Sequence, residues 1–80
     1  NLELSERFFC ALREQLGRTL EELEAAEAGW SEDPRYPDEL PINEFHMQFT
    51  LDMGLHKTRA LVAWVDKSLG RIRARQQTQT

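Results

Sequence analysis

The apolar residues in the second half of the chain recur with alternating steps of four and three residues, the pattern of a heptad repeat. The series is Leu51, Leu55, Thr58, Val62, Val65, Leu69 and Ile72, with Thr58 as its polar member. Such a series lies along one side of an α-helix, and that side must pack against another helix. The pattern therefore predicts a long helix over about residues 41–73 that packs lengthwise against a partner.

A second apolar series, in the first half, recurs every seven residues. Its members are Leu2, Phe9, Leu16, Leu23 and Trp30. It predicts a helix over about residues 2–28 that ends at Gly29, because glycine readily adopts the left-handed conformation at a helix end. Gly17 is a weak helix former, and Thr19 with Glu22 matches the capping-box pattern. A kink or a restart near Gly17 is therefore the alternative to one continuous helix.

The segment between the two series reads as a connector. Pro34, Pro37 and Pro41 each lack a backbone donor, and proline or Asn43 suits the start of the second helix. We expect Tyr36 and Leu40 to cover the end of the core. The predicted fold is all-α, an antiparallel hairpin of two long helices forming a single domain over residues 1–75. The polar tail, residues 76–80, should fray.

The second predicted helix is apolar on more than its heptad side. Phe45, Phe49, Met53, Leu61 and Trp64 widen the apolar face beyond what one helix can cover. A domain of 80 residues also has a small core, worth at most ~3–5 kcal/mol of net stability. We therefore predict a homodimer in which two hairpins form a four-helix arrangement. The predicted dimer-interface residues are Phe9, Leu16, Leu23, Leu51, Leu55, Val62, Trp64, Val65, Leu69 and Ile72.

Charge divides the chain into unlike halves. Residues 1–40 hold eleven acidic and four basic residues, whereas residues 41–80 hold three and six. The halves should attract each other, and the net charge of −4 makes the chain by itself a poor ligand for nucleic acid. The single cysteine, Cys10, and the lack of a leader segment favour the reducing cytoplasm. No apolar run approaches the ~20 residues of a membrane span.

Residues that could carry chemistry are few. His46 and His56 are ten residues apart, about 15 Å along one helix, so they cannot share a metal ion within one chain. No paired Cys or His spacing typical of zinc sites, glycine-rich phosphate loop or nucleophile motif occurs. The carboxylates are spread over predicted helix faces. We expect neither an enzyme nor a bound metal or cofactor.

His56 and Trp64 each allow a functional interpretation as well as a purely structural one. His56-Lys57-Thr58-Arg59-Ala60 faintly resembles the phosphotransfer domains of histidine–aspartate signalling, in which an exposed His is followed by a Lys three positions on and then a Gly. Arg59 and Ala60 stand at those positions, which makes a His56 phosphotransfer module an alternative function. The simpler interpretation pairs His56 with Asp52 on the surface. Trp64 either packs in the core or interface, or forms an aromatic wall for a flat ligand between protomers.

The stretch Leu40-Pro-Ile-Asn-Glu-Phe45, followed by Phe49-Thr-Leu-Asp-Met-Gly54 and by residues 59–69, resembles a known family. It is similar to the carboxy-terminal helical domain of PadR-type bacterial transcriptional regulators, and the resemblance covers roughly residues 2–73. The positions that carry it are Pro41, Phe45, Leu51, Gly54, Trp64 and Leu69. The departures are Gly17 inside the first helix and Thr58 in the seam.

The resemblance implies a dimerisation domain of a repressor. In that family an amino-terminal winged helix-turn-helix domain binds DNA, and the helical domains dimerise and set the spacing of two recognition helices. The present sequence shows no winged domain, so DNA binding would belong to a longer parent protein. Some members respond to a small aromatic effector. A helical protein–protein adaptor is the third function that the pattern leaves open.

Overall fold

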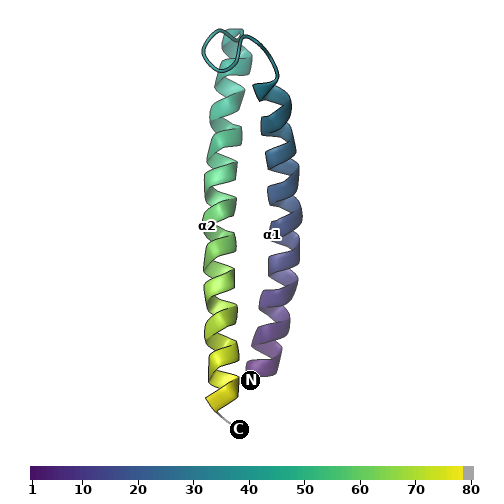
Figure 1. The fold of residues 1–80 in the computed structure, drawn as a ribbon, viewed down its shortest axis with the longest axis vertical. Coiled ribbons are helices and arrows are strands. Elements are labelled where there is room, and N and C mark those ends of the chain that lie inside the picture. The colour runs from purple at the N-terminus through teal and green to yellow at the C-terminus, as the bar shows by residue number, and fades with distance from the viewer. Residues whose placement is uncertain (79–80) are drawn as a thin grey trace.

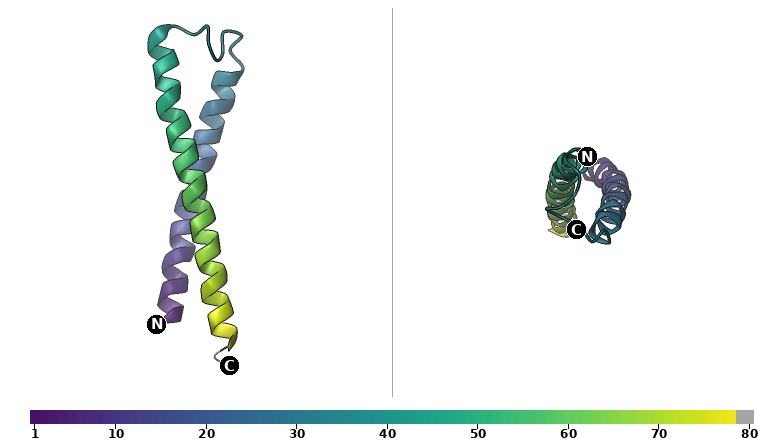
Figure 2. Two further views of the ribbon diagram at one scale, coloured as in Figure 1. Left: turned by 90° about the vertical axis from the view of Figure 1, so that its left-hand side faces the viewer. Right: turned by 90° about the horizontal axis from the view of Figure 1, so that it is seen from above.

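The computed structural model describes residues 1–78 and is an all-α hairpin of two long helices, α1 (Leu2–Ser31) and α2 (Ile42–Thr78). The helices run antiparallel, with both chain ends at one end of the rod and the connector at the other (Figure 1). They cross in the perpendicular view, so they wind around each other rather than lying flat (Figure 2). The rod measures 59 × 17 × 15 Å. The predicted fold class, two long helices packed on each other, is confirmed.

Helix α1 is continuous and longer than predicted. The Asn1 side chain caps it, with Oδ1 accepting a hydrogen bond from the Leu4 N–H at 3.0 Å. The helix does not break at Gly17, and the prediction that it ends at Gly29 is wrong. No residue with positive φ ends it; instead the Glu32 N–H bonds to the Trp30 carbonyl. The last member of the seven-residue apolar series, Trp30, lies in this final part of the helix and is half-buried.

Helix α2 begins where Pro41 and Asn43 indicate but ends later than predicted. The Pro41 carbonyl accepts a hydrogen bond from the Phe45 N–H at 2.9 Å. The helix runs to Thr78, past its predicted end near Arg73, and includes residues 76–78 of the segment expected to fray; residues 79–80 lie outside the described part of the chain. Arg73 and Gln76 both interact with the Glu6 carboxylate of α1, which gives the last turns of α2 partners.

The connector is organised around Asp33. Its carboxylate accepts hydrogen bonds from the Arg35 backbone N–H at 2.9 Å and from Nη2 of the Arg35 guanidinium at 2.8 Å. These two contacts, the side-chain one first, lower the pKa of Asp33 from 3.8 to about 2. Leu40 is buried, as predicted, and closes the end of the core.

The heptad series of α2 faces α1 of the same chain. Leu55 and Val65 have no solvent exposure, and Thr58 and Leu69 are also buried. By contrast, no residue of α1 is buried: its apolar series is half-buried at best. The core is therefore a single seam between two helices, covered on neither side by a third element among the described residues.

Candidate dimer interface and loop-end cavity

The seam divides the hairpin surface into two sides. Successive residues of an α-helix turn by about 100°. Because Val65 points fully into the seam, Trp64 and Asp66 project to opposite sides of it. The same geometry places Phe8 and Cys10 on opposite sides of Phe9. The Trp64 side and the Asp66 side differ in the exposed apolar side chains and in the ion pairs that they carry.

The Trp64 side carries an apolar face, which we define as Phe8, Leu12, Met47, Leu61 and Trp64. Phe8 is 63% exposed and Trp64 is 50% exposed. The Phe9 ring links them, with its centroid 5.4 Å from those of both Phe8 and Trp64 in edge-to-face geometry. Large apolar side chains thus stand in solvent on this side although aromatic contacts hold them in place.

The apolar face continues to the loop end as a shallow groove with a volume of about 380 Å³. Its lining residues carry no charge: Leu23, Ala26, Trp30, Met47, Thr50 and Leu51. Met47, Gly54 and Leu61 recur every seven residues along this side of α2. At Gly54 the two helices come close, since an added Cβ would lie 3.6 Å from Leu23 Cδ1. The apolar face therefore extends along the rod.

The Asp66 side carries an ion-pair face, which we define as Glu6, Arg13, Asp66 and Arg73. Arg13 Nε lies 2.8 Å from Asp66 Oδ1, and Arg73 Nε lies 3.0 Å from Glu6 Oε2. The hydrogen bond from Arg73, and then one from Gln76, lower the pKa of Glu6. In the Glu6–Arg73 pair the first half of the chain supplies the acidic residue and the second half the basic one, as predicted. In the Arg13–Asp66 pair the first half supplies the basic residue instead. This side finds its polar partners within the chain.

Most of the predicted interface residues have a partner in their own chain. Leu55, Val65 and Leu69 are buried between α1 and α2, so they can contact a second copy only if the hairpin opens. The remaining predicted residues except Trp64 are half-buried along the same seam: Phe9, Leu16, Leu23, Leu51, Val62 and Ile72. Trp64 alone among the ten is exposed. Sequence reasoning missed Phe8, Leu12 and Met47, although the flanks of a heptad series are where a second contact would be sought.

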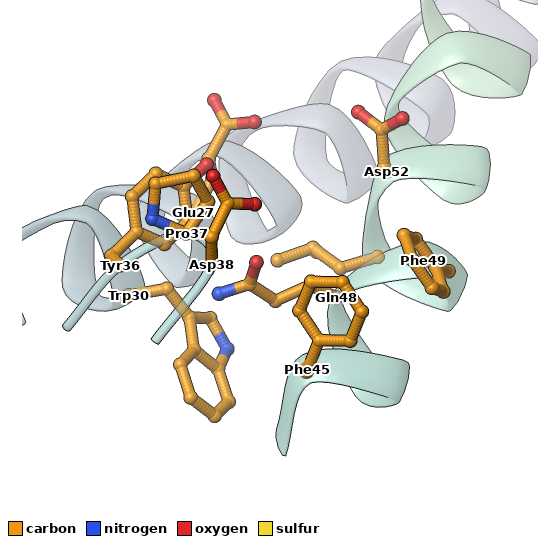
Figure 3. Close-up of a pocket in the computed structure, with 10 residues that line it drawn as sticks. Glu27, Trp30, Tyr36, Pro37, Asp38, Phe45, Gln48, Phe49 and Asp52 are labelled. Atoms are coloured by element: carbon orange, nitrogen blue, oxygen red, sulfur yellow. The ribbon is translucent and has the colours of Figure 1, made fainter. Parts of the chain in front are cut away.

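A cavity of about 210 Å³ opens at the loop end of the hairpin (Figure 3). Both helices and the connector build it. Its lining residues are Glu27, Trp30, Tyr36, Pro37, Asp38, Phe45, Gln48, Phe49, Leu51 and Asp52. The Phe45 and Phe49 rings meet edge to face, with centroids 5.0 Å apart. Four aromatic side chains thus surround one space, and no heptad rule would have collected them.

Some polar groups of the cavity have a partner within the chain, and others do not. Gln48 extends from α2 toward Trp30 and Asp38, and its Nε2 is buried without a hydrogen-bond partner (Figure 3). Within residues 1–78, neither Glu27 nor Asp38 has an ion pair, and no lysine or arginine lines the space. Asp52 lies 3.5 Å from His56 Nε2. The cavity is therefore aromatic and acidic, with one spare donor.

The two histidines do not form a metal site. In the described part of the chain no group of three potential metal ligands comes together. His56 is exposed, and its contact with Asp52 confirms the predicted surface pair. A phosphoryl donor would meet the Asp52 carboxylate at Nε2 instead of a cation, which opposes the approach of an anion. His46 lies against the Phe45 and Phe49 rings.

Over residues 1–78, neither helix contains a segment apolar and long enough to span a membrane. Comparison with known proteins gave no match, whether with family models, with curated proteins or with solved structures.

Proposed function

We propose that this chain is the dimerisation domain of a PadR-like bacterial transcriptional regulator of the cytoplasm. The observation that carries the proposal is the apolar face, which the chain's own helices leave uncovered. A second copy of the chain is its partner, and two hairpins joined through this face make a four-helix arrangement.

The balance of buried and exposed apolar residues supports association. The described core contains four buried apolar residues, Leu40, Leu55, Val65 and Leu69. More large apolar side chains than that are at least half exposed: Leu4, Phe8, Ile42, Met47, Phe49, Met53 and Trp64. Three of these, Phe8, Met47 and Trp64, belong to the apolar face. A seam of this size gives little net stability, and burying the apolar face against another helix pair adds to it. Folding and dimerisation are then coupled, so stability depends on protein concentration.

The chain itself supplies a complementary partner. A two-fold dimer brings the same face of each copy together, so Phe8 and Trp64 of one protomer can meet those of the other. Charge favours the same partner, because the acidic residues 1–40 of one copy attract the basic residues 41–80 of the other. Aromatic side chains at the centre of a face with charges at its rim are typical of stable interfaces.

The residues behind the family resemblance have structural roles that suit a dimeriser. Pro41 starts α2, Gly54 faces Leu23 of α1, and Leu69 is buried in the seam. Trp64 stands on the apolar face. In the parent protein, a rigid dimer of such rods would set the distance between two winged helix-turn-helix domains on a palindromic operator. DNA would be contacted through those domains alone.

The first test is the solution mass of the chain by light scattering over a concentration series. We expect about twice the chain mass of 9.4 kDa. Trp64→Arg should shift the protein to monomer, while Ala63→Arg is the matched control. Ala63 is exposed and lies about 100° from Trp64 around α2, away from the apolar face. A well-folded wild-type monomer contradicts the proposal and favours His56 phosphotransfer or an adaptor role.

A second test addresses the regulator role. The chain is fused behind a monomeric winged helix-turn-helix domain, and binding to a palindromic site is compared with binding to a half-site. We expect preference for the palindrome in the fusion and its loss in the fusion carrying Trp64→Arg. Equal affinity for both sites in a dimeric fusion would leave dimerisation standing and overturn the DNA-positioning role.

A further inference from the structure

The loop-end cavity has a different character from the apolar face. We infer that it binds a small planar aromatic cation that carries a hydrogen-bond acceptor. The inference goes beyond dimerisation, because a single chain builds the cavity from α1, the connector and α2. It rests on the size of the cavity, its aromatic walls, its carboxylates and the unpartnered Gln48 amide.

The size of the cavity limits the ligand to one or two rings. Its volume of about 210 Å³ exceeds the roughly 150 Å³ that accommodates benzene in an engineered apolar cavity. The mouth is open to solvent beside Asp38 and Asp52, so a polar substituent can remain hydrated.

The walls favour a flat, positively charged molecule. Trp30, Tyr36, Phe45 and Phe49 offer ring faces and edges from three segments of the chain. A cation gains from the negative face of an aromatic ring, and most when water is partly excluded. Asp38 and Glu27 add negative charge with no basic residue of the described chain paired to either. An aromatic anion of the same shape would be repelled by the same groups.

The Gln48 amide orients the ligand in the cavity by donating a hydrogen bond to its acceptor atom. Its Nε2 is buried without a partner, and leaving a buried donor unmatched costs free energy. An acceptor atom on the ligand, such as a carbonyl or ether oxygen, removes that cost. Gln48 also stands seven residues before Leu55, where the heptad series would place an apolar residue. A polar side chain at this position is explained by a polar contact that the free chain lacks.

Three bicyclic compounds of similar shape test the inference by calorimetry on the wild-type chain: 6-methoxy-1-methylquinolinium, 2-methoxynaphthalene and 6-methoxy-2-naphthoate. We expect the cation to bind at least fivefold more tightly than the neutral compound, and the anion to bind most weakly. Equal affinity of cation and neutral compound, or no binding of the cation at millimolar concentration, would overturn the inference.

The place of binding is read by nuclear magnetic resonance. The cation should shift the Gln48 side-chain amide and the Trp30 indole signals, while the Trp64 indole serves as an internal control. Shifts centred on Trp64 instead would place the ligand on the apolar face and overturn the assignment. Neither outcome bears on dimerisation, which is measured separately through Trp64→Arg.

Charge-removing variants complete the test. Glu27→Gln and Asp38→Asn keep the shape of the lining, and each should weaken binding of the cation up to about fivefold, as expected for a partly exposed ion pair. Binding of the neutral compound should not change. Glu24→Gln, an exposed carboxylate one turn before Glu27, is the matched control. Unchanged cation affinity in the double variant would contradict the role of charge.

Discussion

The two sides of the hairpin flank the same seam but differ in their contacts: one side has its polar groups paired within the chain, and the other exposes large apolar side chains. The ion-pair face matches Glu6 with Arg73 and Arg13 with Asp66, so its polar groups are paired within the chain. The apolar face leaves Phe8 and Trp64 half or more exposed. A side whose polar groups are paired within the chain needs no partner, whereas burying exposed aromatic side chains against a partner is favourable in free energy. The difference supports the proposal that the apolar face, rather than the ion-pair face, is the side used for assembly.

We expect the largest effect from disrupting the seam between α1 and α2, on which both sides of the hairpin depend. Leu69→Asp or Val62→Asp puts an unpaired charge between α1 and α2, and we expect loss of helical structure or of the dimer at micromolar concentration. Circular dichroism and light scattering together measure this. Ala63→Asp, with the same charge at an exposed position, should stay folded. A stable dimer in the Leu69→Asp variant would count against the seam.

The next largest effect distinguishes the apolar face from the ion-pair side by how a substitution on each changes dimerisation. Phe8→Gln on the apolar face should weaken dimerisation by about 30-fold, the effect of losing an aromatic anchor of ~2 kcal/mol. Glu14→Gln, which follows Arg13 on the ion-pair side of α1, should leave the dissociation constant nearly unchanged. Sedimentation equilibrium gives both constants. The reverse ranking would assign assembly to the ion-pair face.

A smaller effect concerns the loop end. Gln48→Leu replaces the unpartnered amide and continues the apolar series of Leu55, Val62 and Leu69, so we expect a gain in the free energy of unfolding of roughly 1–2 kcal/mol. Chemical denaturation at fixed protein concentration measures it. His56→Leu, which adds the same side chain at an exposed position, is the control and should give no such gain. A destabilised Gln48→Leu variant would mean that the amide already has a partner in solution.

The smallest effect is a pH dependence from the paired carboxylates. The pKa of Asp33 is lowered from 3.8 to about 2 by Arg35, so its ionised form stabilises the fold above pH 3.8. That contribution is lost as the pH falls from 3.8 to about 2. Glu6, whose pKa is also lowered, acts in the same direction. Thermal denaturation of Asp33→Asn should therefore show a weaker decline over this range than wild type, with Asp38→Asn as control.

The helices could be predicted because their signals are local. Seven-residue apolar repeats and a proline at the start of α2 act within one or two turns, so both elements and their partnership follow from spacing. The ends were less accurate. Gly29 and the polar residues 76–78 favour termination locally, but α1 continues to Ser31 and α2 continues to Thr78, with Arg73 and Gln76 in its last turns contacting Glu6 of α1.

The sequence by itself determined an all-α hairpin with a continuous heptad seam and more apolar surface than one helix pair can bury, because periodicity dictates which residues share a helix face. Only the tertiary structure decided how that surface is divided. Seam residues such as Leu55 and Val65 are buried within the chain, whereas Phe8 and Trp64 remain half or more exposed. The loop-end cavity likewise depends on how α1, the connector and α2 meet, since side chains distant in sequence converge there only after the hairpin has closed.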